Sequence, residues 1–217
     1  MIYGFLKVVV KITLRIFFKK IIIQKKHELP NRGPLIVVVN HPNTFMDPII
    51  VASLFKQQVG FLGNASIFVN KIVNAIFAYF HVIRVYRQKD VPEGEKPDND
   101  QSFRDSHQYL KKGGTILIFP EGNSYHELKL RKIKTGAARI ALGAEQENDY
   151  NLNIMVQPVG LYYSNPQRFR SKLYINIGEA FPVKPYIESH KKEAFAGVQQ
   201  LTAVSYTHLT LPTKRIV

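Results

Sequence analysis

The sequence predicts a layered α/β domain preceded by a basic, amphipathic N-terminal helix. Short apolar segments rich in β-branched residues alternate with longer segments of helical periodicity, and this alternation is typical of layered α/β folds. The chain has 217 residues, of which 45% are hydrophobic and 21% charged, so it can bury the core of one domain. It has no cysteine, which excludes disulfides and thiol chemistry.

The charge balance predicts an anionic partner. The formal net charge is +14 at pH 7. Nucleic acid, anionic lipid and phosphorylated substrates would all be attracted by such a chain. The densest basic run lies on an apolar helix and is not interleaved with exposed aromatic residues, so we expect no nucleic-acid partner.

Residues 2–23 are expected to form an interfacial helix. Cations recur in this apolar stretch at a spacing of four residues, at Lys7, Lys11, Arg15 and Lys19. No acidic residue precedes Glu28. A spanning helix needs about 20 mostly uncharged residues, and a signal peptide needs an uninterrupted apolar centre. Residues 1–27 are therefore predicted to lie on an anionic membrane surface, with an ordinary core helix as the alternative.

The strands and helices follow in alternation. Short apolar runs predict strands at 35–39, 59–62, 82–87, 115–119, 155–161 and 173–177. Helical patterns lie between most of them, at 48–55, 67–80, 101–111 and 135–146. The segment 67–80 is apolar almost all round, so it is expected either to be deeply buried or to dip into lipid.

The last fourteen residues differ in kind from the rest. Residues 204–213 read Val-Ser-Tyr-Thr-His-Leu-Thr-Leu-Pro-Thr, which resembles the translation of a transposon-end adapter used to prepare DNA for sequencing. We therefore expect 204–217 to be an adapter-derived tail and 28–203 to be the main domain, truncated at its C-terminus. A genuine C-terminal strand is the alternative.

Polar residues lie at or after the ends of three of the predicted strands. They are Asn40, His41 and Asp47, then Arg84 and Arg87, then Glu121 and Gly122. Ligands gather at the carboxyl ends of strands in open α/β sheets. An imidazole takes up a proton near neutral pH and a carboxylate can orient it, which suits general-base chemistry. Asp47, followed by Pro48, could equally be a helix N-cap.

Four blocks in this order resemble the glycerolipid acyltransferase superfamily, the glycerol-3-phosphate and 1-acylglycerol-3-phosphate acyltransferases. They are Asn40-His41 with Asp47, the strand Ile83-Arg84-Val85-Tyr86-Arg87, the run Phe119-Pro120-Glu121-Gly122, and the apolar strand around Pro158. The resemblance covers roughly residues 30 to 180. It implies an α/β fold with a mixed, mainly parallel sheet flanked by helices.

The resemblance also implies an activity. It is that of an O-acyltransferase in phospholipid biosynthesis, which moves a fatty acyl group from acyl-CoA or acyl-carrier protein to a hydroxyl of glycerol-3-phosphate or 1-acylglycerol-3-phosphate. His41 and Asp47 would be the catalytic pair, with His41 as general base. The substrate would be bound by Asn40, Arg84, Arg87, Glu121, Gly122 and Lys134. No cofactor and no metal is implied, and the expected place is the cytoplasmic face of a bacterial inner membrane.

Two departures from the family pattern leave the acceptor open. Five residues, 42–46, separate His41 from Asp47, whereas four are commoner in the family. The longer spacing resembles that of a branch of the family that includes fungal glycerol-3-phosphate and dihydroxyacetone-phosphate acyltransferases. One extra residue rotates a continuous helix by about 100°, so the pair can meet only if the spacer is partly a turn. Asn123-Ser124 stand where the family often has Thr-Arg, and Arg131 or Lys134 would replace that arginine.

Alternatives to this interpretation stay open. One is an acyltransferase with another lysolipid, aminolipid or sugar acceptor; another is a non-catalytic, membrane-bound lipid-binding protein. Arg84 and Arg87 could be ordinary rim charges, and Glu121 could form a structural ion pair. The basic loop over 129–134 could be a solvated turn or a further membrane contact.

Overall fold

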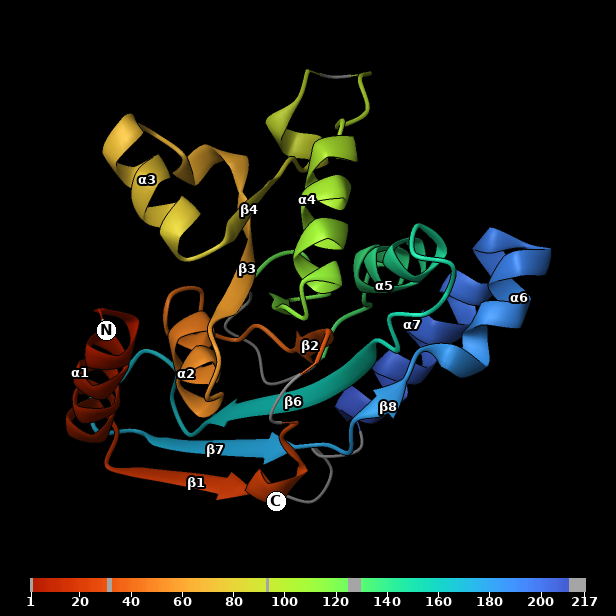
Figure 1. The fold of residues 1–217 in the computed structure, drawn as a ribbon. Helices are drawn as coiled ribbons and strands as arrows, with labels where there is room; N and C mark the ends of the chain where they lie inside the picture. The colour runs from red at the N-terminus through yellow and green to blue at the C-terminus, as the bar shows by residue number, and fades with distance from the viewer. Residues whose placement is uncertain (1, 31–32, 93, 125–129, 211–217) are drawn as a thin grey trace.

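The computed structural model describes residues 2–30, 33–92, 94–124 and 130–210, which build one mixed sheet with helices on both faces (Figure 1). The strands are β1 (Lys20–Gln24), β2 (Leu35–Val39), β3 (Val59–Asn64), β4 (Val82–Val85), β5 (Thr115–Ile118), β6 (Met155–Tyr163), β7 (Lys172–Ile177) and β8 (Phe181–Pro182). The α-helices are α1 (Ile2–Phe17), α2 (Met46–Leu54), α3 (Lys71–Tyr79), α4 (Asp100–Lys111), α5 (Gly136–Gln146), α6 (Ile187–Lys192) and α7 (Ala194–Thr210).

Most neighbouring strands of the sheet run parallel. Their order is β1-β7-β6-β2-β5-β3-β4, and β8 also pairs with β6. β6 is antiparallel to β7 and β8, whereas the other pairings are parallel. The predicted mixed, mainly parallel sheet flanked by helices is therefore confirmed. Because β2 lies between β5 and β6 and runs parallel to both, all three strands end at the same edge of the sheet.

β2 shows how the sheet separates two hydrophobic cores. Its residues are all buried. Ile36 and Val38 face the core beneath α4, α5 and α7, whereas the other three side chains face the core beneath α1 and α2 (Figure 1). Since successive side chains of a strand point to opposite faces, a strand covered on both sides needs an unbroken apolar run.

The N-terminal helix is shorter than expected. α1 ends at Phe17, and Lys20–Gln24 forms β1, which pairs in parallel with β7. The expectation of one helix over residues 2–23 is therefore wrong beyond residue 17. Residues 21–23 are isoleucines, whose β-branched side chains lose rotamer freedom in a helix but fit a pleated strand. The sheet consequently begins before residue 28, where we expected the main domain to start.

The apolar segment 67–80 forms a shorter, exposed helix. α3 begins after Asn70, whose side chain accepts a hydrogen bond of 2.9 Å from the N–H of Val73 and caps the helix. None of its residues is buried, so the deeply buried alternative is wrong. Ile72 and Ile76 are 74% and 49% exposed. Within the described ranges, every helix is too short or too polar to cross a bilayer.

The other predicted strands and helices are present, with ends shifted by a few residues. α6 and α7 are C-terminal elements that the sequence patterns did not predict. α7 continues to Thr210, so residues 204–210 are helical and the alternative of a C-terminal strand is wrong for them. Residues 211–217 lie outside the described residues. The adapter origin of 204–217 stays a prediction, which rereading the DNA beyond Ala203 tests.

Candidate active site

Two loops at the carboxyl edge of the sheet meet around His41. The first follows β2 and leads into α2, and the second follows β5 and contains Glu121. β2 and β5 are adjacent and parallel, so their following loops leave the sheet side by side. The backbone N–H of His41 donates a hydrogen bond of 3.0 Å to Oε1 of Glu121. The structure therefore brings two of the predicted polar blocks into direct contact.

His41 and Asp47 lie within hydrogen-bonding distance of one another. Nδ1 of His41 is 2.9 Å from Oδ2 of Asp47. Residues 42–45 form bends and a turn, and α2 begins at Met46, so the spacer has the non-helical shape that its length requires. Asp47 is fully buried in the first turn of α2, whereas 12% of the His41 side chain is exposed. The imidazole therefore reaches the surface and its carboxylate partner does not.

Asp47 does not cap α2. The N-cap position is occupied by Phe45, and Asp47 lies inside the first turn. The alternative in which Asp47 is the N-cap is therefore wrong. Its Oδ2 instead accepts a hydrogen bond of 2.7 Å from the N–H of Asn43, which holds the preceding turn against the helix.

Tyr163 completes the hydrogen bonding of the Asp47 carboxylate. Its hydroxyl donates to Oδ1 of Asp47 at 2.5 Å, from the end of β6. Tyr163 is fully buried, and this burial, followed by the charge of Asp47 and the hydrogen bond to it, raises the pKa of Tyr163 far above its ordinary value. The hydroxyl therefore keeps its proton and stays a donor. Both oxygens of the carboxylate are held in place.

The ring of His41 is fixed on one face as well as at Nδ1. It stacks on Phe119, with ring centroids 3.8 Å apart and an angle of 13° between the planes. A carboxylate beside Nδ1 favours the tautomer that carries its proton there. Nε2 is then the nitrogen with a lone pair. This arrangement suits a general base whose orientation is set before the substrate arrives.

Glu121 is bonded mainly to the backbone. It is 8% exposed, and besides the bond to His41 its Oε2 accepts a hydrogen bond of 3.3 Å from the N–H of Arg131. The carboxylate thus joins the loop after β2 to the segment before α5. Glu121 therefore positions the two loops through its bonds to their backbones. Direct binding of the acceptor by Glu121 stays a prediction.

Cationic side chains lie at Gly122 and at Asn123, the residue that follows it. Gly122 has φ +76°, a left-handed conformation that glycine adopts without strain. A Cβ atom there would lie 2.7 Å from Nζ of Lys134, whose side chain crosses the glycine. Nη1 of Arg87 donates a hydrogen bond of 3.3 Å to Oδ1 of Asn123, while its Nε pairs with Asp90 at 3.2 Å. Arg87, Gly122 and Lys134 therefore lie in one part of the molecule. Of the basic loop 129–134, Lys129 lies outside the described residues.

The two other predicted binding residues have different surroundings. The guanidinium of Arg84 lies over the ring of Phe68, 4.5 Å from its centroid, and the residue is exposed. The side chain of Asn40 donates to the carbonyl of Leu161 at 2.8 Å and accepts from its N–H at 2.7 Å. Asn40 thereby extends the pairing of β2 with β6, and substrate binding by these two residues stays a prediction.

The sequence patterns did not single out Tyr163 or Phe119 as parts of the site. Phe119 belongs to a block used for the resemblance, but nothing in one sequence indicates that its ring stacks on His41. Tyr163 follows Asp47 by 116 residues, and only the pairing of β6 with β2 brings the two together. The available signal was its position two residues after the predicted strand 155–161.

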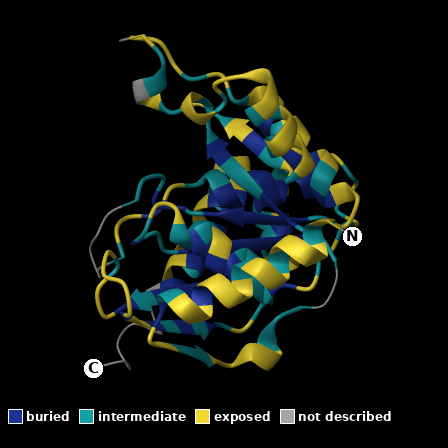
Figure 2. Ribbon diagram, turned by 90° about the vertical axis from the view of Figure 1, so that its left-hand side faces the viewer, coloured by how far each residue is buried: buried dark blue, intermediate teal, exposed yellow. Residues whose placement is uncertain are grey.

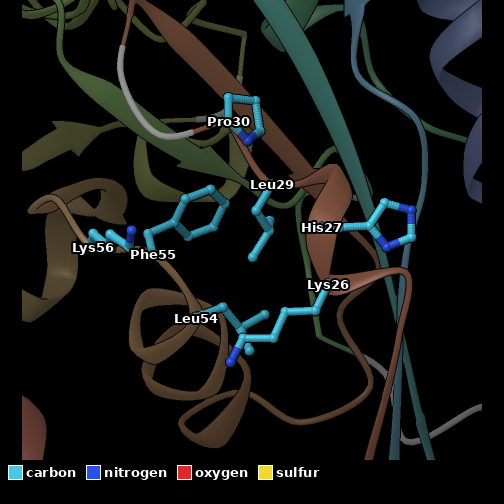
Figure 3. Close-up of a pocket in the computed structure, with 7 residues that line it drawn as sticks. All are labelled: Lys26, His27, Leu29, Pro30, Leu54, Phe55 and Lys56. Carbon is cyan, nitrogen blue, oxygen red and sulfur yellow. The ribbon is translucent and has the colours of Figure 1, made fainter.

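Two pockets lie near α2. One of about 370 Å³ is at the amino end of β2, opposite the end that carries His41, and its lining residues are shown in Figure 3: Lys26, His27, Leu29, Pro30, Leu54, Phe55 and Lys56. The ring of His27 turns away from the other side chains, so the ionisable side chains that remain beside the apolar ones are Lys26 and Lys56 (Figure 3). The other, of about 290 Å³, lies between α1 and α2 and is almost wholly apolar: Tyr3, Leu6, Lys7, Val10, Ile49, Ala52, Ser53, Phe61 and Phe80.

Comparison with known families gives one match. The model of the family described as Acyltransferase matches residues 20–162, which contain β1 to β5, all of β6 except Tyr163, and His41, Asp47 and Glu121. In the part of the chain that the structure describes, no three His, Cys, Asp or Glu side chains group as a metal ion would require.

Comparison with individual proteins gives relatives of greater length. Glycerol-3-phosphate O-acyltransferase 2 of Saccharomyces cerevisiae is 36% identical over 108 residues, which are 49% of this chain and 14% of that protein. An uncharacterized acyltransferase of Schizosaccharomyces pombe is 23% identical over 279 aligned residues. The alignment covers 88% of this chain and 41% of the S. pombe protein. The chain therefore spans less than half the length of these relatives.

Solved structures with a similar fold include a bacterial enzyme. The crystal structure of the 1-acyl-sn-glycerophosphate (LPA) acyltransferase PlsC from Thermotoga maritima aligns with a TM-score of 0.56 and 22% identity. The alignment covers 87% of this chain and 74% of that one. At this identity the likeness concerns the fold.

Proposed function

Since this chain belongs to the acyltransferase family, we propose that it transfers a fatty acyl group from a thioester donor to a hydroxyl of glycerol-3-phosphate or 1-acylglycerol-3-phosphate. The observation that carries this proposal is the contact of 2.9 Å between His41 and Asp47 beside the exposed edge of the imidazole. Two of the relatives named above act, by their names, on these two acceptors, which supports both.

The geometry supports a direct transfer to the acceptor. Nε2 of His41 takes the proton of the acceptor hydroxyl, and that oxygen attacks the thioester carbonyl. When the tetrahedral intermediate collapses, the C–S bond breaks and the leaving thiolate takes the proton from the imidazolium. Asp47 stabilises the positive charge that His41 carries between these two transfers. No acyl-enzyme forms, so the chain needs no nucleophile of its own.

The phosphate of the acceptor would lie at Gly122. The side chain of Lys134 occupies the space that a Cβ of Gly122 would fill, and Arg87 reaches the neighbouring Asn123, so two cations lie at this turn. Arginine binds phosphate through paired, charge-assisted hydrogen bonds. The ion pair of Arg87 with Asp90 holds the guanidinium near the site before the acceptor arrives.

The acyl chain would enter the apolar pocket between α1 and α2. Ile49 lines it from α2, two residues beyond Asp47, and Phe61 and Phe80 line its far side. Such a lining suits a hydrocarbon chain, because ligand pockets are lined mainly by apolar groups. The donor carrier, acyl-CoA or acyl-carrier protein, is not distinguished by this pocket.

We further propose that the chain works on an anionic membrane surface. α1 is amphipathic and basic, and its Lys11, Arg15 and neighbouring Lys19 are exposed. Both proposed acceptors and the product are anionic, and 1-acylglycerol-3-phosphate resides in membranes. The proposed place is the cytoplasmic face of a bacterial inner membrane.

The decisive experiment replaces His41. Purified chain is incubated with a radiolabelled acyl-CoA or acyl-carrier protein and a panel of acceptors, and the lipid products are identified by mass spectrometry. His41→Ala is expected to lose at least about a thousandfold in rate. His27→Ala is the matched control, because His27 is an exposed histidine at the opposite end of β2. Full transfer by His41→Ala would contradict the mechanism, and product with neither phosphorylated acceptor would contradict the substrate assignment.

A further inference from the structure

α1 is apolar on two opposite faces. Its inner face packs Leu14 into the core beneath α2. Its outer face, which carries large exposed side chains, is formed by Phe5, Val8, Val9, Ile12 and Ile16. α1 crosses the front of the molecule in Figure 2, with much of its surface exposed. A helix with this pattern has an outer face that needs a partner.

A basic turn lies against the end of this helix. It connects β6 to β7, comprises residues 164–171, and contains Arg168, Phe169 and Arg170 in succession. All three are exposed, and the ring-bearing residue Phe169 is 57% exposed. No acidic residue occurs in the turn. We refer to residues 164–171 as the Arg-Phe-Arg turn.

The Arg-Phe-Arg turn contacts the C-terminal end of α1 through backbone hydrogen bonds and a ring contact. The N–H of Arg170 donates to the carbonyl of Phe17 at 2.8 Å, and the N–H of Lys19 donates to Ser171 at 2.9 Å. The rings of Phe17 and Phe169 meet edge to face, with centroids 5.6 Å apart. These contacts place Phe169 and its arginines directly beyond the end of the outer face of α1.

The same turn is hydrogen-bonded to the loop that carries His41. The side chain of Asn43 donates a hydrogen bond of 2.6 Å to the carbonyl of Pro166. The N–H of Asn43 also donates to Asp47, so two hydrogen bonds connect the turn to the carboxylate that holds His41. Between Asn43 and Asp47 lies Phe45, which is 80% exposed. Exposed aromatic residues thus stand on both sides of this junction.

We propose that the Arg-Phe-Arg turn is a second membrane contact, which inserts Phe169 among the lipids and binds anionic headgroups with Arg168 and Arg170. Together with the outer face of α1 and with Phe45, it would set the loop of His41 on the leaflet. This inference rests on the proposed function for its purpose, because a membrane-resident acceptor must reach His41. It extends that proposal from one helix to a docking surface around the active site.

Charge selects an anionic leaflet as the occupant. Two of the exposed apolar groups of this surface are accompanied by cations: Lys11, Arg15 and Lys19 on and after α1, and Arg168 and Arg170 beside Phe169. Asp47, the carboxylate linked to the turn through Asn43, is fully buried. A second copy of the chain would bring the same positive charge to the contact, so self-association through this surface is disfavoured. Arginine side chains beside exposed apolar and aromatic side chains are typical of interfacial binding.

The test compares variants of the full chain on two kinds of vesicle. Cosedimentation is measured with vesicles of phosphatidylcholine alone and of phosphatidylcholine mixed with phosphatidylglycerol. Phe169→Ala should weaken binding about fivefold on both, since the insertion of a phenylalanine is lost. Arg168→Gln should weaken binding about fivefold on the mixed vesicles only, and high salt should remove the difference.

Matched controls lie on the other side of the molecule. Phe195, at the start of α7, is 60% exposed, and α7 lies across the sheet from α1 in Figure 1. Arg104, in α4, is an exposed arginine remote from the turn. Phe195→Ala and Arg104→Gln should leave vesicle binding unchanged. Thermal melts followed by circular dichroism should show that Arg168→Gln and Phe169→Ala are folded.

The outcomes separate this inference from the proposed function. Acyl transfer to glycerol-3-phosphate is measured without vesicles, with a short-chain donor, and Phe169→Ala should retain it. If Phe169→Ala and Arg168→Gln bind both kinds of vesicle like the unaltered chain, the inference is overturned while the transfer activity stands. If the unaltered chain sediments as a dimer that Phe169→Ala dissociates, the surface binds a second copy and the inference is also overturned. If neither the unaltered chain nor any variant transfers an acyl group, the proposed function is overturned. The vesicle measurements would then still decide whether the turn binds a membrane.

Discussion

The carboxylate of Asp47 accepts hydrogen bonds from groups that come from separate parts of the chain. The imidazole of His41 and the N–H of Asn43 bind one oxygen, and the hydroxyl of Tyr163 binds the other. An isolated charge in such a buried position would be strongly disfavoured, but a carboxylate with several donors is stabilised. At the scale of residues, the site is thus built around a buried anion that orients one partly exposed base.

Replacing Asp47 tests that arrangement. In Asp47→Asn the charge is lost and the amide cannot accept hydrogen bonds at both of its atoms, so His41 would lose its preferred tautomer. We expect a fall in kcat of about a thousandfold or more, with a smaller change in KM. The matched control is Asp105→Asn in α4, an exposed aspartate that bonds to Gln101. A kcat within about tenfold of the unaltered chain would show that Asp47 does not position the base.

Tyr163 makes stability depend on alkaline pH. Burial raises its pKa in the folded chain above the ordinary value of about 10. Above that pH the unfolded tyrosine loses its proton while the folded one keeps it, so the unfolded state binds fewer protons. The free energy of unfolding therefore decreases as the pH rises above about 10, and the contribution is intact below it.

The variant Tyr163→Phe should show a smaller decrease over this alkaline range, measured by urea unfolding at a series of pH values. The decrease will not disappear, because burial also raises the pKa of Tyr3, Tyr109 and Tyr186. At neutral pH the variant should be about 2 kcal/mol less stable, since a buried carboxylate oxygen loses its donor. Tyr162→Phe, on the opposite face of β6, is the control. Equal slopes for both variants would contradict the assignment to Tyr163.

At the scale of elements, α1 and α2 form the wall of the proposed acyl pocket. They pack against each other in the core that covers one face of the sheet, and the apolar pocket remains between them. β1 follows α1 after a short connection and joins the sheet beside β7, so the helix is anchored at its C-terminal end. The position of this wall is therefore set by the edge strand as well as by helix packing.

A larger side chain in the pocket should shorten the acyl chain that the enzyme accepts. Ala52 lines the pocket from α2 and is only partly buried, so phenylalanine can occupy the cavity of about 290 Å³. We expect Ala52→Phe to lower the rate with long-chain donors about tenfold or more and to retain the rate with the shortest donors. The donor series is read by mass spectrometry of the products. An unchanged chain-length profile would exclude this pocket as the acyl site, and the retained short-chain rate is the control for folding.

At the scale of the whole molecule, the net charge of +14 lies on a surface that is strongly apolar at one edge. α1, the Arg-Phe-Arg turn and Phe45 are exposed there, and the turn and Phe45 follow the carboxyl ends of β6 and β2. Charge alone would suit nucleic acid as well as lipid. The association of cations with exposed isoleucine, valine and phenylalanine favours lipid.

A direct comparison of partners checks this preference. At physiological salt the full chain should sediment with vesicles that contain phosphatidylglycerol, and it should show no retarded band with duplex DNA at the same protein concentration. Vesicles of phosphatidylcholine alone should bind more weakly, because the contribution of about 1 kcal/mol per basic residue near the surface is lost. Salt-sensitive binding to DNA without binding to vesicles would contradict the proposal.

The sequence alone indicated the class of fold, the identity of the blocks and the two residues of the dyad. These features depend on short-range patterns: the buried run Leu35–Val39, the polar groups after each strand, and the spacing of five residues between His41 and Asp47. Such patterns are readable because a strand covered on both faces must be apolar, and because loops at one sheet edge converge.

Only the tertiary structure decided the partners of those residues. Tyr163 lies 116 positions from Asp47, and Pro166 lies 123 positions from Asn43, so no local pattern links them. The end of α1 at Phe17 was likewise decided by pairing with β7, which offered the isoleucines after it a ladder of backbone hydrogen bonds. Contacts between residues remote in sequence depend on strand order, and strand order follows from how the whole chain buries its apolar faces.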